Sequence, residues 1–390
     1  MPAAVPPAPF APADLADALR PFGQSRMLPR AAYTSQRVLD FELARFFAGS
    51  WVCVGRAEDL PAPGAQRAAR AGGVGVLLVR GADGQVRAFA NVCRHRGHEL
   101  LPAGGAACRR TVLCPYHAWT YDLDGSLRVA PGFRGADGFD PAAHGLVELP
   151  VEVWHGFLLC NGSGDAPPLA EHVGALDGLV APYRPERLVA LASHAYEVEA
   201  NWKVVLENYH ECYHCPLIHP ELCQVSPPDS GRNLALPGAW VGGTMILRDH
   251  AATMSLDGRS GGVPIPGLAG EALRTVLYAG LLPNLLLSLH PDYLMTHLIA
   301  PLAPDRCEIR CTWYFPPEAV ARPGFDPAYG VDFWDRTNRQ DWAACESVQR
   351  GLASPHFRPG PLAPAEDAVY RLVTMLARGY LDGRPGTGRH

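Results

Sequence analysis

Apolar and polar positions follow different periods in different parts of this chain. From Val52 to about Cys160, short apolar runs such as VGVLLVR, QVRAFANV and AWTYDL are separated by glycine and aspartate. Runs of this length between turn residues are typical of β-strands. Asp83-Gly84 and Asp124-Gly125 lie between such runs, and each pair predicts a hairpin turn. The pattern predicts a small all-β domain.

Helical periodicity flanks this β region on both sides. The segment VLDFELARFFAGSW predicts an entry helix, NGSGDAPP is linker-like, and the Gly- and Pro-rich residues 254–270 predict a mobile loop. After the linker, the sequence mixes predicted strands with predicted helices. The predicted helices are Val38–Trp51, Asn201–Tyr213, Asp332–Leu352 and Glu366–Arg378, and the predicted strands are Leu285–His290, Tyr293–Ala300 and Glu308–Phe315.

One acid in the predicted helix Asp332–Leu352 lies on its apolar side. At roughly 100° per residue, Asp341 falls inside the predicted buried stripe, whereas the other charged residues gather on another face. Burying a carboxylate is costly unless it is paired or coordinated. A salt bridge to a buried arginine and a metal ligand are both consistent with this position. The stripe consists of Trp334, Asn338, Cys345, Val348 and Leu352, and the other face carries Asp335, Arg339, Glu346 and Arg350.

Composition excludes several classes of protein. The 390 residues are 48% hydrophobic and 19% charged, with a formal net charge of -5, as in ordinary globular proteins. This charge favours neither nucleic acid nor an anionic membrane as a partner. No apolar run reaches the roughly 18 residues that a membrane span needs. The N-terminal MPAAVPPAPFAPADL lacks a basic n-region, so it predicts a disordered arm and not a signal peptide. Eleven cysteines without an export signal indicate the cytoplasm, where thiols serve as ligands or as small buried side chains.

Two short loops in the β region each offer one thiolate and one imidazole. Cys93-Arg-His95 and Cys114-Pro-Tyr-His117 are separated by 18 residues. A zinc finger groups its cysteines and its histidines separately, whereas this interleaving suits a two-iron cluster with two Cys on one iron and two His on the other. A structural zinc site is the alternative.

A second group of candidate ligands lies in ENYHECYHCPLIHPEL, residues 207–222. His210-Glu-Cys-Tyr-His214 formally matches the H-E-x-x-H motif of zinc peptidases. Pro216 argues against a continuing helix, and the longer peptidase motif fails at Leu217 and Pro220. We therefore expect Pro216 to break the helix, so that His214 and His219 can share a metal, with Glu211 beside them. Two His and one carboxylate with open positions are typical of non-haem Fe(II) oxygenases, and Asp341 is the candidate carboxylate.

These motifs together resemble the catalytic α subunit of Rieske non-haem iron oxygenases, the ring-hydroxylating oxygenase family. CRHRGHELL and CPYHAWTYDLDG correspond to the cluster loops, NWKVVLENYHECYHCPLIHP to the mononuclear iron motif and NRQDWAACESVQRGL to the third ligand. The resemblance implies an α+β chain with an N-terminal arm and entry helix (1–43), an all-β Rieske [2Fe-2S] domain (44–160) and a helix-grip catalytic domain with a central antiparallel sheet (161–390). It implies Cys93, His95, Cys114 and His117 as cluster ligands and His214, His219 and Asp341 as Fe(II) ligands.

The resemblance also implies partners and a reaction. Electrons come from NAD(P)H through a separate flavin/iron–sulfur reductase, the chain forms a homotrimer, and Glu211 bridges the iron site to a cluster histidine of a neighbouring subunit. A glutamate at this position, with SLDGRSGG and LLLSLHPDY, is similar to glycine-betaine and proline-betaine monooxygenases. The implied reaction is O₂-dependent N-demethylation of a quaternary ammonium compound. Aromatic side chains most often pack in a core, and an aromatic wall for the cation is the alternative role of four of them. These four are Tyr209, Trp240, Tyr278 and Tyr293.

Two other functions fit parts of the pattern. An aromatic ring-hydroxylating dioxygenase α subunit would use the same metal centres. A pure Rieske electron carrier has an additional Cys pair in its cluster loops, but this chain has Gly97 and Tyr116 at those positions.

Overall fold

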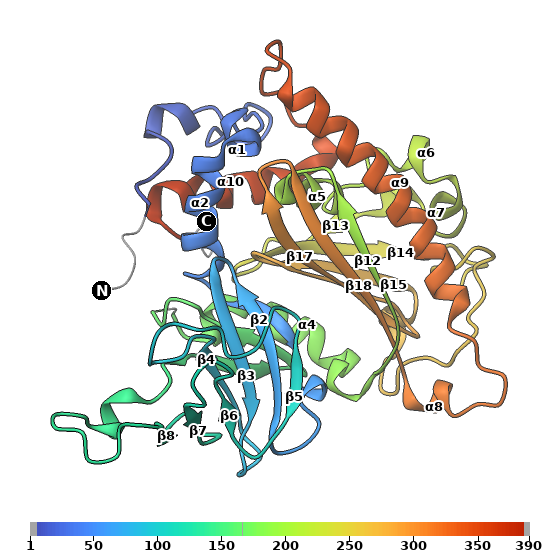
Figure 1. Cartoon of the computed structure of the whole chain (residues 1–390). Coiled ribbons are helices and arrows are strands. Elements are labelled where there is room, and N and C mark those ends of the chain that lie inside the picture. Colours follow the sequence, from blue (N-terminus) through green and yellow to red (C-terminus); the bar gives the residue numbers. More distant parts are fainter. Residues whose placement is uncertain (1–5, 166, 386–390) are drawn as a thin grey trace. The chain divides into compact units, whose positions relative to one another are not determined.

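The computed structural model describes residues 6–165 and 167–385 (Figure 1). The chain divides into two compact units, Leu43–Pro167 and Met1–Glu42 together with Pro168–His390. The N-terminal segment therefore belongs to the same unit as the C-terminal half of the chain. Each unit has its own sheets and its own core.

The unit Leu43–Pro167 is built from three small antiparallel sheets, as the short apolar runs predict. Asp83-Gly84 joins paired strands β3 and β4, and Asp124-Gly125 joins β7 and β8, so both predicted hairpins are confirmed. The sheets have the orders β1-β11-β10, β5-β2-β3-β4-β9 and β6-β7-β8. The strands are β1 (Val52–Arg56), β2 (Ala65–Ala71), β3 (Val74–Arg80), β4 (Val86–Ala90), β5 (Ala106–Cys108), β6 (Val112–Leu113), β7 (Thr120–Tyr121), β8 (Leu127–Val129), β9 (Glu148–Leu149), β10 (Val151–Trp154) and β11 (Phe157–Cys160).

The second unit is organised around a seven-stranded antiparallel sheet in the order β12-β18-β17-β16-β15-β14-β13. Every residue of the central strand β16 is buried, which explains why its sequence LLLSL is apolar except for Ser288. The three strands predicted here are confirmed, with limits that differ by a few residues. The strands are β12 (Val189–Val198), β13 (Arg232–Asn233), β14 (Trp240–Ile246), β15 (Thr275–Leu281), β16 (Leu285–Leu289), β17 (Leu294–Ala303) and β18 (Arg306–Phe315).

The long helix α9 runs along this sheet and packs beside α5 (Figure 1). This arrangement confirms the predicted α+β architecture with a central antiparallel sheet. Among the described residues, no helix combines the length and the hydropathy needed to cross a bilayer. The α-helices are α1 (Ala31–Thr34), α2 (Gln36–Glu42), α3 (Leu169–Val173), α4 (Leu176–Val180), α5 (Trp202–Tyr209), α6 (Cys215–Ile218), α7 (Pro220–Val225), α8 (Pro317–Val320), α9 (Ala328–Ala353) and α10 (Asp367–Asp382).

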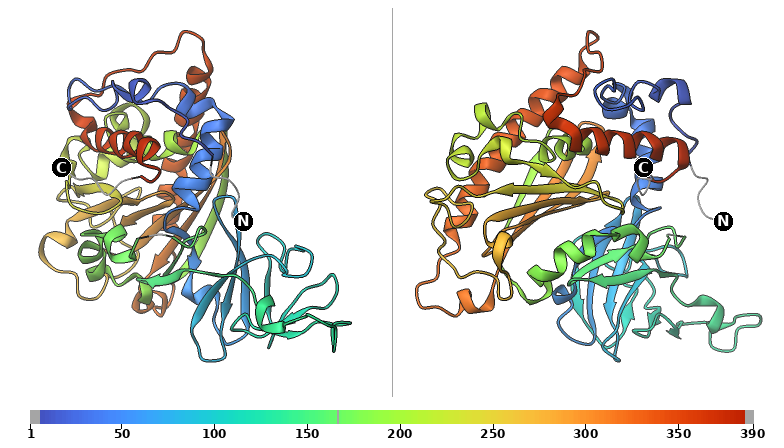
Figure 2. Two further views of the ribbon diagram at one scale, coloured as in Figure 1. Left: turned by 90° about the vertical axis from the view of Figure 1, so that its left-hand side faces the viewer. Right: turned by 180° about the vertical axis from the view of Figure 1, so that it is seen from behind.

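The first described residues of the chain pack against α10 (Figures 1 and 2). Pro12–Leu15 forms a 3-10 helix with Leu15 buried, and the ring of Phe10 lies 5.0 Å from that of Tyr380 on α10. The prediction of a disordered arm is therefore wrong for residues 6–15, because Phe10 and Leu15 find apolar partners that the local sequence does not reveal. Residues 1–5 lie outside the described part of the chain.

A buried polar network joins α2 to α5 and α10. Glu42 accepts hydrogen bonds at 2.7 Å from Lys203 Nζ and from Trp202 Nε1, and a further one from the hydroxyl of Tyr380. Glu42 and Lys203 are fully buried, so water does not solvate their charges and each charge is instead compensated by the other. The network ties the end of α2 to the helix that leads into the candidate metal site.

The periodicity of α9 correctly predicts most of its buried face. Trp334, Asn338, Cys345 and Leu352 are buried, but Val348 is 50% exposed, so its assignment to the buried stripe is wrong. The stripe drifts around the helix over 26 residues, and no element covers Val348. Asp341 lies on the inner side with 15% of its side chain exposed.

Candidate metal centres and their cavity

The two predicted cluster loops have the same backbone turn. The N–H of Gly97 donates to the carbonyl of Cys93 at 3.0 Å, and the N–H of Ala118 donates to that of Cys114 at 3.1 Å. Gly97 and Ala118 have φ of 72° and 57°, so each loop turns back through a left-handed residue. Cys93 and Cys114 are buried in the core of their unit. The strands thus hold two thiols inward, each with a histidine a few residues later.

The histidines of these loops also lie together. The rings of His95 and His117 are 4.8 Å apart, and Trp119 stacks on His95 at 4.9 Å with an interplanar angle of 4°. Nδ1 of His117 is buried and has no hydrogen-bond partner among the described residues. A buried imidazole nitrogen without a partner, next to a second imidazole and two buried thiols, fits a [2Fe–2S] cluster held by two Cys and two His.

Tyr121 is a residue of this site that sequence reasoning missed. Its hydroxyl lies 3.3 Å from Cys93 Sγ and accepts a hydrogen bond from the backbone N–H of Arg94 at 3.0 Å. A hydrogen bond donated to a cluster thiolate is one of the interactions that set the reduction potential. No local pattern marks Tyr121, because β7 and the Cys93 loop belong to different sheets and meet only in the core of the unit.

The three candidate ligands of the second site come from the ends of short helices and from α9. His214 immediately precedes α6, His219 lies between α6 and α7, and Asp341 projects from the middle of α9. The expected break at Pro216 is wrong in detail. Pro216 stands in the first turn of α6, where a proline leaves no hydrogen bond unmade, and the chain instead leaves the helical path after Tyr209 and again at His219.

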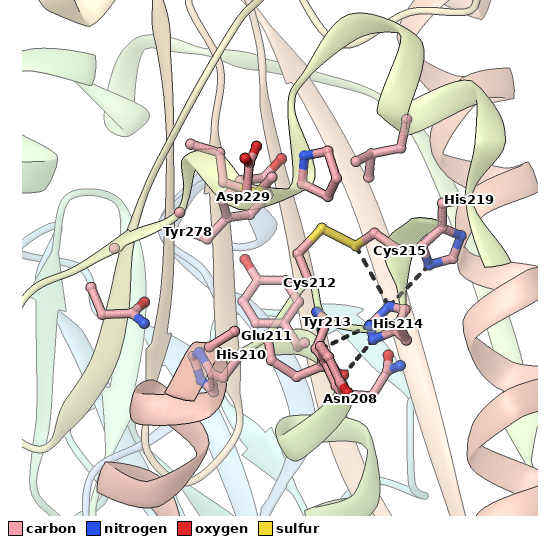
Figure 3. A pocket seen from close by; sticks show the side chains of 18 of the residues that line it. Asn208, His210, Glu211, Cys212, Tyr213, His214, Cys215, His219, Asp229 and Tyr278 are labelled. Atoms are coloured by element: carbon pink, nitrogen blue, oxygen red, sulfur yellow. Dashed lines mark hydrogen bonds and ion pairs between the residues drawn. A yellow bond between two sulfur atoms is a disulfide. The ribbon is translucent and has the colours of Figure 1, made fainter. Parts of the chain in front are cut away.

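The donor atoms of these three side chains converge on one point. Nε2 of His214 lies 3.2 Å from Nε2 of His219 (Figure 3). Oδ1 of Asp341 lies 3.4 Å from Nε2 of His214 and 2.9 Å from Nε2 of His219. Adjacent ligands at about 2.1 Å from a metal are about 3 Å apart in octahedral geometry. The separations therefore fit a metal held on one face by two imidazoles and one carboxylate.

Each imidazole is oriented by a hydrogen bond from its other nitrogen. Nδ1 of His214 is bonded to Oε1 of Glu211, and Nδ1 of His219 is 2.8 Å from Oε1 of Gln340. With Nδ1–H donated outward, Nε2 presents its lone pair to the metal position. Gln340 was missed in the sequence, although it adjoins Asp341.

The charges of the site are mutually dependent. Burial by itself lowers the pKa of His214, but Asp341 and Glu211 outweigh it and raise the pKa to about 9. Burial likewise raises the pKa of Asp341, but the two histidines outweigh it and the net shift is downward. The metal-free site thus holds a buried carboxylate against the protonated imidazole of His214, and a divalent cation can replace that proton.

The alternative of a zinc peptidase fails on geometry. Its two histidines would have to face one metal from one helix, but α5 ends at Tyr209, before His210. Nε2 of His210 points at Gly280, where a Cβ atom would lie only 2.5 Å away. Burial lowers the pKa of His210 to about 3, so it is a neutral core residue.

A cavity of about 600 Å³ opens onto the three candidate ligands. Among the described residues that line it there is no lysine or arginine, whereas four carboxylates are present. The aromatic lining includes Trp334 and Tyr278, whose rings are 6.2 Å apart at 69°. The four carboxylates belong to Glu211, Asp229, Asp341 and Asp367.

The structure brings only part of the predicted aromatic wall to this cavity. Tyr209 and Tyr278 line it, but Trp240 and Tyr293 are not among its lining residues. Tyr293 instead lies behind Trp334, whose indole N–H donates to the tyrosine hydroxyl at 2.8 Å. Trp334 was placed on the buried face of its helix from the sequence, but its part in the cavity depends on the packing of α9.

Cys212 and Cys215 form a disulfide at the cavity (Figure 3). The prediction that the cysteines are ligands or reduced core thiols is wrong for this pair. The other nine cysteines, all within the described residues, are not disulfide-bonded. The sequence ECYHC contains the C-x-x-C spacing, but this spacing alone does not distinguish a disulfide from two free thiols.

Two known protein families match two separate segments of the chain, one containing the cluster loops and one containing the second metal site. The family described as Rieske [2Fe-2S] domain matches residues 50–140, and the family described as ring hydroxylating alpha subunit (catalytic domain) matches residues 185–381. The chain belongs to the Rieske non-haem iron oxygenases. The glycine betaine monooxygenase oxygenase subunit of Pseudomonas aeruginosa is 31% identical over 374 residues, 89% of this chain and 87% of that protein.

Solved structures show the same fold for this Rieske oxygenase. The crystal structure of the quaternary ammonium Rieske monooxygenase CntA has a TM-score of 0.79 and 26% identity, covering 95% of this chain and 98% of that one. Naphthalene 1,2-dioxygenase from Rhodococcus has a TM-score of 0.75 and 19% identity, covering 92% and 94%, which shows a shared fold alone.

Family membership decides the cofactors and the class of reaction. The oxygenase uses a Rieske [2Fe–2S] cluster and mononuclear Fe(II), and it consumes O₂ with electrons from NAD(P)H through a separate reductase. The pure electron carrier is excluded because a catalytic domain is present. Since the fold is shared with an aromatic dioxygenase, it does not decide the substrate.

Proposed function

We propose that this oxygenase hydroxylates an N-methyl group of a quaternary ammonium compound such as a betaine, releasing formaldehyde. The observation that carries the proposal is the charge of the cavity, which has four carboxylates and, among the described lining residues, no lysine or arginine. A permanent cation is stabilised there, whereas a neutral arene gains nothing from the carboxylates. The relative from Pseudomonas aeruginosa is named for glycine betaine, and CntA for quaternary ammonium compounds.

The aromatic rings of the cavity offer the complementary contact. A trimethylammonium group binds the faces of aromatic rings through their quadrupole, and edge-to-face pairs such as Trp334 and Tyr278 form two sides of a box for it. The hydrogen bond from Trp334 to Tyr293 holds the indole in place. The chain's own residues thus position one N-methyl group and keep water from it.

We further propose that His214, His219 and Asp341 hold the mononuclear iron and that Cys93, His95, Cys114 and His117 hold the cluster. These ligands assign the cluster to residues 44–160 and the iron to residues 161–390. When bound, the iron supplies O₂ activation with electrons delivered by the cluster. With two electrons and two protons, one oxygen atom enters the C–H bond and the other leaves as water. The resulting N-hydroxymethyl compound splits into a tertiary amine, formaldehyde and a proton.

We propose that Glu211 has two tasks in this reaction. Within the subunit its carboxylate accepts hydrogen bonds from Nδ1 of His214 and from that residue's backbone N–H at 3.2 Å, which orients the ligand. In a homotrimer it connects the iron site to a cluster histidine of the neighbouring subunit. The proposed compartment is the cytoplasm, where the reductase finds NAD(P)H.

The test is a product assay with the purified oxygenase, a reductase, NADH and O₂. Betaines, choline-like compounds, their neutral carbon isosteres and arenes are compared for formaldehyde and for cis-diol. We expect one formaldehyde for each O₂ consumed with an ammonium compound and none with its neutral isostere. Formation of a cis-diol from an arene, with no ammonium compound oxidised, would instead establish the ring-hydroxylating dioxygenase.

Tyr278 offers a matched pair of variants for the cation contact. Its hydroxyl is buried without a hydrogen-bond partner among the described residues, so Tyr278→Phe keeps the ring and loses little. Tyr278→Leu removes the ring. A cation–π contact of about 1–2 kcal/mol predicts that KM for the ammonium substrate rises about tenfold in Tyr278→Leu and hardly changes in Tyr278→Phe. Equal KM values in the two variants would contradict the aromatic contact.

A further inference from the structure

The disulfide between Cys212 and Cys215 lies within the iron motif itself. It closes a loop of four residues that contains His214, and the N–H of Cys215 donates to the carbonyl of Cys212 at 3.2 Å. Glu211 precedes the loop and orients His214. The bond therefore holds together the residues that set the direction of one candidate metal ligand.

Both cysteines of the disulfide also lie close to the cavity and to the candidate metal ligands. Cys212 and Cys215 line the cavity, and Sγ of Cys215 lies 3.9 Å from Nε2 of His214, the nitrogen that faces the metal position (Figure 3). Cys212 is partly exposed and Cys215 is buried, so a small dithiol can attack the bond from the cavity through Cys212. In the disulfide neither sulfur carries the negative charge that a metal ligand needs.

Reduction would change the donor set of the site. A free thiol at Cys215 could join His214, His219 and Asp341 as a fourth donor. Sulfur and nitrogen ligands of a tetrahedral zinc ion are about 3.5 Å apart, close to the 3.9 Å between Cys215 Sγ and His214 Nε2. Four donors with one thiolate favour tetrahedral zinc, whereas two His and one carboxylate with open positions suit Fe(II).

We propose that Cys212 and Cys215 form a thiol–disulfide switch that decides which metal the triad accepts. As a disulfide the pair leaves three donors for iron, and as a dithiol it adds Cys215 and favours zinc, which closes the site to O₂. In the reducing step, a dithiol such as dithiothreitol transfers two electrons and two protons to the bond and becomes a cyclic disulfide. In the reverse step, a hydroperoxide takes two electrons from the thiols, so that the S–S bond forms and water and an alcohol, or two waters, leave. The proposal depends on the metal triad and not on the identity of the substrate.

The experiment measures metal choice, not turnover. The full-length protein, with its cluster intact by visible spectrum, is stripped of mononuclear metal. It is kept as the disulfide or reduced with dithiothreitol, then desalted anaerobically and offered equimolar Fe(II) and Zn(II). Bound zinc is counted per chain, and mononuclear iron is counted as the iron in excess of the two irons of the cluster. Free thiols are counted by alkylation followed by mass measurement. We expect reduction to add two alkylated thiols and to raise the ratio of bound zinc to mononuclear iron at least tenfold.

Three variants separate the switch from general effects of reduction. Cys212→Ser leaves a permanent thiol at Cys215 and should prefer zinc without any reductant. Cys215→Ser has no fourth donor, so its metal ratio should not respond to reduction. Cys108→Ser, which removes an exposed free cysteine elsewhere, should behave as the unmodified protein.

Several results would overturn the switch. An unchanged zinc-to-iron ratio on reduction refutes it, as does a Cys215→Ser variant that still responds. A pair that stays reduced even after hydroperoxide treatment also refutes it. Absence of mononuclear metal in both redox states would refute the triad and the switch together, whereas failure of N-demethylation alone would leave both standing.

Discussion

Glu207 predicts a specific dependence of stability on pH. It lies on α5, one helical turn before Glu211, and accepts a hydrogen bond at 2.7 Å from the hydroxyl of Tyr33 on α1. Burial raises the pKa of Glu207 from the ordinary 4.5 to about 8, although the Tyr33 hydrogen bond and the charge of Lys203 act in the opposite direction. At neutral pH the folded protein therefore keeps a proton on Glu207 that the unfolded chain releases.

The sign and the size of the effect follow from linkage. Because the pKa of Glu207 is higher in the folded protein than in the unfolded chain, its protonation contributes to the free energy of unfolding. This contribution is fully present below pH 4.5 and is lost as the pH rises to about 8. Each pH unit in this window costs about 1.4 kcal/mol, so the unfolding free energy falls by about 5 kcal/mol in total and by about 3 kcal/mol at pH 7. Glu207→Gln cannot ionise, and its amide oxygen still accepts the hydrogen bond from Tyr33.

The assay is urea unfolding of the holoenzyme at several pH values between 5 and 8. Glu207→Gln should match the unmodified protein near pH 5 and exceed it increasingly towards pH 8, by about 4–5 kcal/mol at the upper end. Glu318→Gln, at an exposed position on α8, is the matched control and should show no such divergence. Parallel pH curves for Glu207→Gln and the unmodified protein would refute the raised pKa.

Three further variants test the iron site and its surroundings. Asp341→Ala should lose mononuclear iron while keeping the visible spectrum of the cluster, and retained iron with full activity would place the third ligand elsewhere. Glu211→Gln should keep both metal centres but lower turnover sharply, measured as formaldehyde per O₂; normal coupled turnover would refute the bridging role. Gly280→Ala should lower the unfolding free energy by about 1–3 kcal/mol, since the new methyl group would lie 2.5 Å from Nε2 of His210; unchanged stability would show that His210 moves aside at no cost.

The sequence alone indicated the components of both metal centres. Cys93-Arg-His95 and Cys114-Pro-Tyr-His117 suggested a two-iron cluster because ligand type and spacing are local properties. The turns at Asp83-Gly84 and Asp124-Gly125 were likewise predictable, because a glycine adopts the positive φ that a tight turn needs. Helical periodicity placed Asp341 on the inner face of α9 before any partner was known.

Only the tertiary structure decided what these residues meet. The register of the sheet and the packing of α9 bring Asp341 to His219, although 122 positions separate them. The same packing makes Trp334, and not Tyr293, the cavity wall and leaves Val348 exposed. The packing of α10 gives Phe10 a partner in Tyr380. Periodicity reports which side of an element is apolar, whereas the neighbour on that side depends on contacts between distant segments. The sequence therefore indicated which side chains are candidate metal ligands, whereas the tertiary fold decided which residues each of them contacts.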